Sequence, residues 1–163
     1  MGLWRSTTHQ WRRWTALSAR ERVILLQAAA LLPVVALGRR ALSVKRLQAA
    51  LSRASPARRG MARDRALGVI EALRVARLVQ LAADRGPVRA NCLERSLVLW
   101  ALLRRRGIDS DLRIGARKHG ERLEGHAWVE WDGVVLNDAD DAQERFVVVP
   151  LPPVTPDKTG YDV

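Results

Sequence analysis

The chain has 163 residues, enough for one domain with a buried core. Its composition, 48% hydrophobic and 28% charged, is typical of a globular protein, and its single cysteine excludes an internal disulfide or a multi-cysteine metal site. Residues 1–91 carry 18 Lys/Arg and 4 Asp/Glu, a surplus of +14, whereas residues 92–163 carry 10 and 13. A basic surface can attract nucleic acid, anionic lipid or an acidic protein, or can simply keep exposed helices soluble. Because zinc patterns, Gly-rich phosphate loops and RNP-like motifs are absent from the sequence, we expect no nucleic-acid partner.

The first ninety residues predict a layer of helices. Ser18 and Glu21 form a capping-box pattern that begins a helix over residues 18–37, and Gly38 is predicted to end it. Its apolar run, residues 23–37, is short for a membrane span. Leucines at helical spacing predict a second helix over residues 43–53 and a third over residues 62–86. The apolar positions of the third helix are Leu67, Ile70, Leu73, Leu78 and Leu81.

The second half begins with the strongest helix signal. Asn91 is the predicted N-cap, Glu94 the N3 residue and Gly107 the C-cap of a helix that is apolar almost all round. Such a helix is expected to be buried. A strand over residues 110–117 follows, then a polar loop to Glu124, a hairpin over residues 125–138 and another strand over residues 145–149. Helices followed by a small antiparallel sheet define an α+β fold.

The lone cysteine, Cys92, lies in the first turn of the buried helix. There the free backbone N–H groups and the positive end of the helix dipole favour a thiolate over a thiol. An imidazole nearby would complete its activation, and a carboxylate on the far ring nitrogen would fix the tautomer. His126 and Asp138 lie on one hairpin and can supply both groups. A cysteine first on a helix, followed by a histidine and an acid on a sheet, is the arrangement of papain-like thiol catalysis.

The spacing of His126 and Asp138 predicts the turn of this hairpin. A two-residue turn at Asp132-Gly133 would pair His126 with Ala139 and send Asp138 to the opposite face of the sheet. A three-residue turn over 131–133, with Gly133 in the bulge position, would instead pair His126 directly with Asp138. We therefore predict the three-residue turn.

Each of these residues also has a purely structural interpretation. Cys92 could simply pack in the core, His126 could be a hydrogen-bonded strand residue, and Asp138 could end a strand. Two further acids, Asp140 and Asp141, fall past the predicted strand end, and His119 is expected to face solvent. The hypothesis of a site depends on three residue types in the right order, each on the element that its role requires.

The segment from "NCLERSLVLWALLRRRGI" through "LRIGAR" to "EGHAWVEWDGVVLND" resembles the leader peptidases of lasso-peptide biosynthesis, which belong to the transglutaminase-like cysteine peptidases. The resemblance implies that Cys92 is the nucleophile, His126 the base and Asp138 the orienting acid. It also implies a papain/transglutaminase-like fold and removal of the leader from a ribosomally made precursor before a macrolactam cyclase acts. A separate protein that recognises the leader is the third expected partner.

These expectations divide the chain into a basic arm (residues 1–17), one peptidase domain (18–149) and a proline-rich, disordered tail (150–163). Within the domain, a helical layer (18–90) precedes the catalytic core (91–149). The arm contains Trp4, Trp11 and Trp14, and we favour its docking on a protein partner over contact with a membrane.

The predicted chemistry needs neither a metal nor a cofactor. The backbone N–H of Cys92 is the expected oxyanion donor, with Asn91 and Arg89 as candidates for a second donor. We expect a cytoplasmic cysteine endopeptidase; a leader-binding module without catalysis and an acyl transferase on the same fold remain alternatives.

Overall fold

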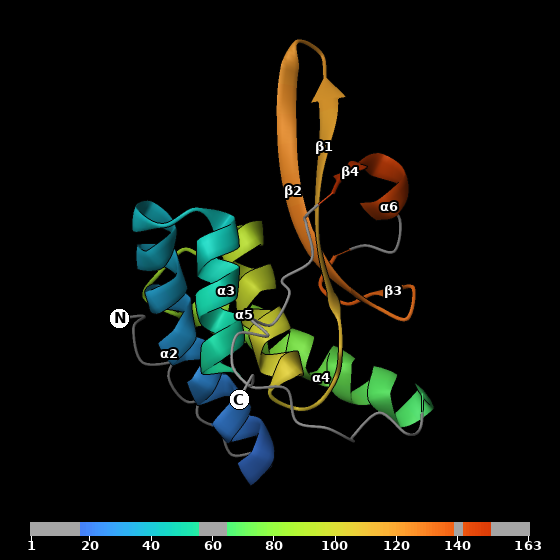
Figure 1. Ribbon diagram of the computed structural model, residues 1–163. Helices are drawn as coiled ribbons and strands as arrows, with labels where there is room; N and C mark the ends of the chain where they lie inside the picture. The colour runs from blue at the N-terminus through green and yellow to red at the C-terminus, as the bar shows by residue number, and fades with distance from the viewer. Residues whose placement is uncertain (1–16, 56–64, 139–141, 151–163) are drawn as a thin grey trace, which may run out of the picture.

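The computed structural model describes residues 17–55, 65–138 and 142–150, so the predicted arm (except Leu17) and tail (except Pro150) lie outside the described residues. Helices pack around α5, and a four-stranded antiparallel sheet covers the other side of that helix (Figure 1). The fold is α+β, as predicted. The helices are α2 (Ala19–Ala41), α3 (Val44–Ala54), α4 (Arg65–Arg85), α5 (Cys92–Arg104) and α6 (Ala142–Arg145). The strands are β1 (Asp111–His119), β2 (Arg122–Trp131), β3 (Val134–Val135) and β4 (Val147–Val149).

Helix α2 begins as predicted but ends later. The Glu21 N–H donates to Ser18 Oγ at 3.3 Å, and the Ser18 N–H donates to Glu21 Oε2 at 2.8 Å, which completes the capping box. The prediction that Gly38 ends the helix is wrong, because α2 continues to Ala41. Gly38 instead permits close packing, since a Cβ there would lie only 2.9 Å from Leu47 Cδ1 on α3.

Helix α2 is also longer than its apolar run suggested. Its 23 residues make it the one helix, in the part of the chain that the structure describes, long and apolar enough to cross a membrane by length and composition. One face of α2 nevertheless packs into the core through Ile24, Leu25, Ala28, Leu32 and Val35.

Helix α4 buries small residues and exposes several of its larger ones. Leu67, Ile70 and Leu73, expected on the apolar face, are 64%, 55% and 43% exposed. Leu78 is buried as expected, together with a row of alanines and valines: Ala72, Val75, Ala76, Val79, Ala82 and Ala83. Because these side chains are small, the backbone of α4 can lie close to α2 and α5, and this row forms the core face of the helix.

Helix α5 is the buried centre of the domain. Residues 96–103 are all buried, and the helix packs against α2 and α4 on one side and β1 and β2 on the other. It ends at Arg104, after which Gly107 adopts a φ of +73° and turns the chain towards the sheet. The buried helix that the sequence predicted is therefore confirmed.

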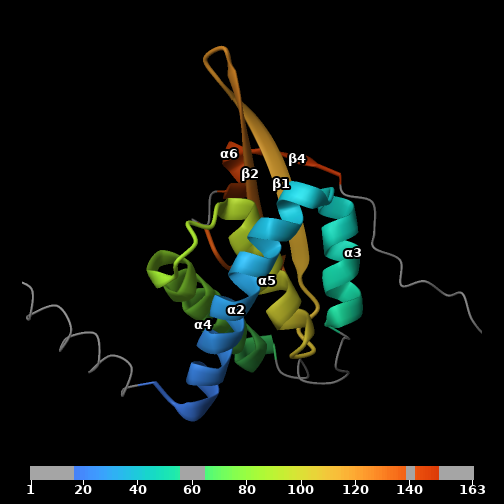
Figure 2. The ribbon, with the colours of Figure 1, turned by 90° about the vertical axis from the view of Figure 1, so that its left-hand side faces the viewer.

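The sheet has the strand order β3-β2-β1-β4, and its two long strands form a hairpin that extends beyond the helices (Figures 1 and 2). The predicted polar loop up to Glu124 is wrong. Residues on both sides of the tip pair directly, as His119 with Arg122 and Arg117 with Glu124, and Gly120 turns the chain at a φ of +62°. Charged side chains that pair across strands can extend a hairpin that looks like a loop in sequence. The predicted last strand is confirmed as β4, and the short helix α6 in front of it was not predicted.

Candidate active site

The cysteine occupies the first position of α5, in a turn held by side chains. The Glu94 N–H donates to Asn91 Oδ1 at 2.9 Å, and the Asn91 N–H donates to Glu94 Oε2 at 3.0 Å. Glu94 is buried and also accepts a 2.8 Å hydrogen bond from Arg39 Nε at the end of α2. Cys92 itself is half-buried. The turn that presents the thiol is thus fixed to the helical layer by a charge-assisted bond.

The histidine and the acid lie in contact. His126 Nε2 and Asp138 Oδ2 are joined by a hydrogen bond, with 25% and 21% of the two side chains exposed. Because this bond occupies Nε2, Nδ1 is the ring nitrogen left to face a nucleophile. The second carboxylate oxygen of Asp138 lies 3.6 Å from a guanidinium nitrogen of Arg145 on α6. The carboxylate is therefore held from two sides.

The plane of the imidazole is set by aromatic neighbours. The ring of His126 stacks on Phe146, with centroids 4.9 Å apart, and at 6.1 Å on Trp128. Arg117 lies 4.9 Å above the Phe146 ring and bonds Glu124 across the hairpin at 2.8 Å. This bond holds the pKa of the Glu124 carboxyl below its usual value of 4.5. Phe146, which follows α6, thus packs between the imidazole of His126 and Arg117 of the β1–β2 hairpin.

The predicted three-residue turn is wrong. Trp131 pairs with Val134, and Asp132 and Gly133 have φ values of +51° and +79°, which is the two-residue turn with two left-handed residues. In this register residue 139, not Asp138, would oppose His126. The contact between His126 and Asp138 must therefore have another cause.

Asn137 provides that cause, because it ends the regular pairing. The Leu136 N–H still donates to Val129 O at 2.9 Å, but the Val129 N–H donates at 2.8 Å to the Asn137 side-chain Oδ1. In a regular antiparallel pair it would donate to the backbone carbonyl of Leu136. The side chain takes the place of that carbonyl, the chain bends over residues 136–138, and Asp138 comes to the histidine.

The same asparagine joins the hairpin to the helix of the cysteine. Asn137 Nδ2 donates to Ser96 Oγ at 2.9 Å, and the Ser96 hydroxyl donates to Ala127 O at 3.0 Å. Ser96 is fully buried and lies one helical turn after Cys92, whereas Ala127 directly follows His126. These bonds bring the start of α5 beside the strand of the histidine.

The described residues contain no hydrogen bond from the Cys92 thiol to the ring of His126. Catalytic hydrogen bonds are often long in the absence of substrate. The amide oxygen of Asn91, the suggested oxyanion residue, is engaged in the cap of α5. Arg89 is exposed, and His119 is an exposed residue paired with Glu124 at 3.3 Å, as expected for a surface histidine. Asp140 and Asp141 lie outside the described residues.

Sequence reasoning missed Ser96, Asn137, Phe146 and Arg145. Only Ser96 carried a usable signal, since it is one helical turn from Cys92 and is polar in an apolar helix. In the parts of the chain that the structure describes, groups of three or more His, Cys, Asp or Glu side chains that could hold a metal ion do not occur.

Residues 25–150 match the transglutaminase-like superfamily, and the chain belongs to that superfamily. It is also similar to the microcin J25-processing protein McjB of Escherichia coli, with 36% identity over 61 residues. These residues make up 37% of this chain and 28% of that protein, so the similarity spans under a third of the relative's length. These matches confirm the resemblance to proteins of lasso-peptide biosynthesis that the sequence indicated. Comparison with solved structures gives no match.

Proposed function

We propose that the protein is a cysteine endopeptidase that removes the leader from a lasso-peptide precursor. The observation that carries the proposal is the contact between His126 and Asp138. The strand of His126 is hydrogen-bonded to α5, the helix that begins with Cys92. Membership of the transglutaminase-like superfamily supports thiol chemistry, and similarity to a microcin J25-processing protein supports a precursor peptide as substrate.

In the proposed reaction, the Cys92 thiolate attacks the scissile carbonyl, and the C–N bond breaks as protonated His126 gives its proton to the leaving amine. Water, deprotonated by the same imidazole, then hydrolyses the thioester and frees the thiol. Asp138 holds the ring and its tautomer through Nε2. The backbone N–H of Cys92 stabilises the oxyanion, with Asn91 or Arg89 as candidates for the second donor. None of these steps requires a cofactor.

We further propose that the peptidase works with a separate leader-recognition protein and supplies a macrolactam cyclase with the freed amine. These partners follow from the resemblance in residues 91–138. Acyl transfer to an amine is the alternative on the same fold, because both reactions share the thioester. Reactions with and without an added amine, followed by mass measurement of the products, separate the two.

The test is incubation of the protein with precursor and leader-recognition protein, followed by mass spectrometry. We expect leader removal by the native chain, and a loss of at least about a thousandfold in rate for Cys92→Ala. Because Cys92 is the only cysteine, a second thiol in the chain cannot replace it. Unchanged processing by Cys92→Ala would rule out thiol catalysis and favour a leader-binding module.

Alkylation provides an independent control. Iodoacetamide can label only Cys92, and its rate at neutral pH should fall in His126→Ala if the imidazole activates the thiol. Equal rates in both proteins would indicate an ordinary thiol and contradict the proposed pair.

A further inference from the structure

Helix α2 exposes a continuous apolar face. Val23, Leu26, Val34 and Leu37 are 52%, 59%, 59% and 63% exposed, and Ala30 between them is also exposed. Their spacing of three and four residues places them in one stripe along the helix. Figure 2 looks onto α2, which covers the front of the domain there. The stripe lies opposite the core face of the same helix.

Charges frame this stripe but do not interrupt it. The sequence between Arg22 and Arg39 contains no Asp, Glu, Lys or Arg. Arg20 and Arg22 lie at the start of α2, and Arg40 lies in its last turn. Lys45 and Arg46 at the start of α3 add exposed positive charge near the same end. An apolar face between two basic ends is complementary to lipid with anionic headgroups.

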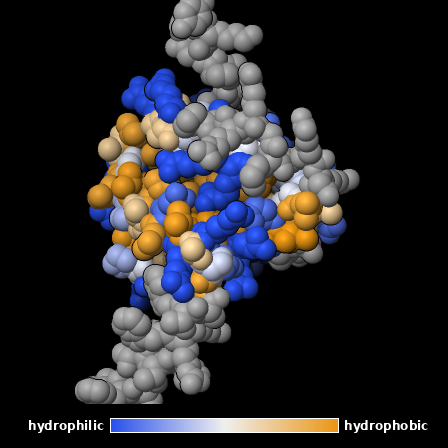
Figure 3. Space-filling model, turned by 90° about the horizontal axis from the view of Figure 1, so that it is seen from below, coloured by the Kyte–Doolittle hydropathy of each residue, from blue (hydrophilic) through white to orange (hydrophobic). Residues whose placement is uncertain are grey.

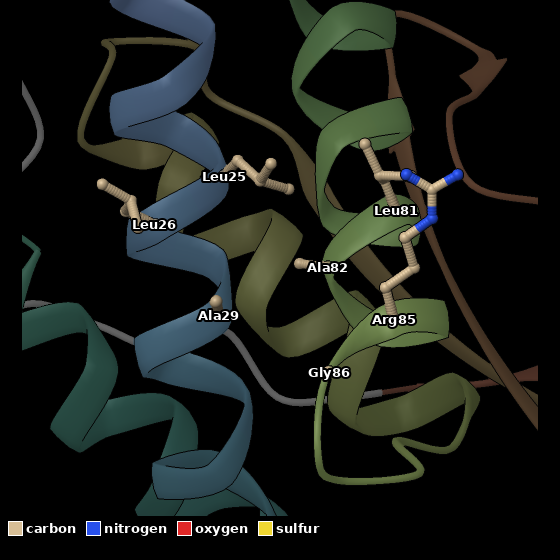
Figure 4. Close-up of a pocket in the computed structure, with 7 residues that line it drawn as sticks. All are labelled: Leu25, Leu26, Ala29, Leu81, Ala82, Arg85 and Gly86. Atoms are coloured by element: carbon tan, nitrogen blue, oxygen red, sulfur yellow. The ribbon is translucent and has the colours of Figure 1, made fainter. Parts of the chain in front are cut away.

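The neighbouring surface continues the apolar character. A pocket of about 230 Å³ opens between α2 and α4 and is lined mostly by aliphatic side chains (Figure 4). Leu26 belongs both to this pocket and to the stripe, and Arg85 lies at the pocket's other side. On α4, Leu67, Ile70 and Leu73 are also exposed. Seen from below, hydrophobic and hydrophilic residues are interspersed over this end of the molecule (Figure 3).

We propose that the outer face of α2 (Val23, Leu26, Ala30, Val34 and Leu37) lies on a bilayer surface that carries anionic lipid. The helix would lie along the interface and not across it, because its other face is part of the core and leaves the core only if the domain opens. A protein partner fits less well. Protein interfaces are rich in aromatic anchors, whereas the large hydrophobic residues exposed in the described chain are all valine, leucine or isoleucine.

This orientation leaves the candidate active site accessible. Helix α2 packs on α3, α4 and α5, and the sheet with His126 packs on another side of α5 (Figures 1 and 2). A domain seated on α2 therefore keeps the sheet that carries His126 on the side of α5 away from the lipid. The proposal does not depend on the peptidase activity.

Co-sedimentation of the full chain with vesicles tests the proposal. One vesicle preparation contains only phosphatidylcholine, and the other is an equimolar mixture with phosphatidylglycerol. We expect binding to the mixed vesicles that weakens with added salt, and much weaker binding to phosphatidylcholine alone. A native chain that stays in the supernatant with the mixed vesicles would overturn the proposal.

Substitutions locate the binding face. The variant Leu26→Gln/Val34→Gln/Leu37→Gln should reduce vesicle binding by about tenfold or more. The variant Arg20→Gln/Arg40→Gln should reduce mainly the salt-sensitive part of vesicle binding. The matched control is Leu123→Gln, which removes a 77% exposed leucine from the hairpin tip and should bind like the native chain. All five changed positions on α2 are exposed, and circular dichroism checks that each variant is folded.

Two outcomes would contradict the assignment. Native-like vesicle binding by the triple variant would show that α2 is not the contact. A dimer of the native chain in vesicle-free solution that becomes a monomer in the triple variant would show that a second copy covers the stripe. Light scattering without vesicles distinguishes this case.

Discussion

At the scale of single residues, the candidate site depends on a side chain that performs a backbone role. Asn137 offers Oδ1 to the Val129 N–H and Nδ2 to Ser96 Oγ, so one amide ends the β2–β3 ladder and joins it to α5. The contact between His126 and Asp138 exists because the chain bends at this amide. Removal of the amide should therefore affect the geometry of the site more than the binding of a peptide.

We predict that Asn137→Ala lowers kcat for precursor cleavage by about a hundredfold, with little change in KM, since small displacements of reacting groups have effects of that size. It should also cost about 1–3 kcal/mol of stability, because the Val129 N–H loses its acceptor. Steady-state kinetics and thermal unfolding measure the two effects.

Asn137→Asp is the matched control. It keeps an oxygen for the Val129 N–H but cannot donate to Ser96, so its stability should be closer to that of the native chain while kcat stays reduced. Ser96→Ala should resemble it in kcat. A kcat that falls only in proportion to the folded fraction would indicate that Asn137 has no positioning role.

The sequence was sufficient to predict that His126 and Asp138 lie together, but not to predict which feature of the fold brings them into contact. The residue types, their order and their elements predicted the contact. The three-residue turn that was predicted in support of this contact was wrong. Alternation along a strand describes backbone pairing, and it does not predict that a side chain will replace a backbone carbonyl as hydrogen-bond acceptor. Phe146 and Arg145 were missed because they reach the site from the end of α6, a short helix that the sequence did not predict.

At the scale of elements, the β1–β2 hairpin supports the site through tight packing on one glycine. Gly115 pairs with His126, and a Cβ at this position would lie 2.8 Å from Phe146 Cβ and 2.9 Å from Trp128 Cη2. Both aromatic rings stack on the imidazole. The sequence predicted the strand but could not show that this position has no room for a side chain.

We predict that Gly115→Ala destabilises the domain by about 1–3 kcal/mol through overpacking and lowers the rate of precursor cleavage. Denaturant unfolding and cleavage kinetics test this expectation. Gly125→Ala is the control on the same hairpin, because nothing lies within 4 Å of a Cβ built there. If both variants behave alike, packing against Phe146 and Trp128 does not position the histidine.

The hairpin should also respond to acid. Arg117 lowers the pKa of Glu124 by a hydrogen bond to the carboxylate, so this bond stabilises the fold above the usual value of 4.5. The contribution is lost as the pH falls through the lower pKa of the folded state. We predict that Glu124→Gln weakens the decline of the unfolding temperature between about pH 5 and pH 3. Glu121→Gln, at the exposed hairpin tip, is the control and should retain the native decline.

At the scale of the whole molecule, the domain separates two kinds of surface. The helical layer presents the basic residues and the apolar face of α2, and the sheet presents the histidine and its acid. The distribution of charge along the sequence predicted that the helical layer is the basic side, because residues 1–91 carry a surplus of +14. It could not predict which face of α2 remains exposed, because both faces of that helix are apolar and only packing on α4 and α5 distinguishes them.

The position of His126 and Asp138 at the two ends of the β2–β3 hairpin also has a consequence for the folding of the chain. Their hydrogen bond joins residues 12 apart, whereas the bond from Ser96 to Ala127, beside the thiol, joins residues 31 apart. Contacts between near neighbours in sequence close sooner during folding than distant ones. Under the proposed function, the acid–base pair would form first and the thiol would reach it only when the domain is complete. A partly folded chain would therefore be unable to hydrolyse peptides, itself included.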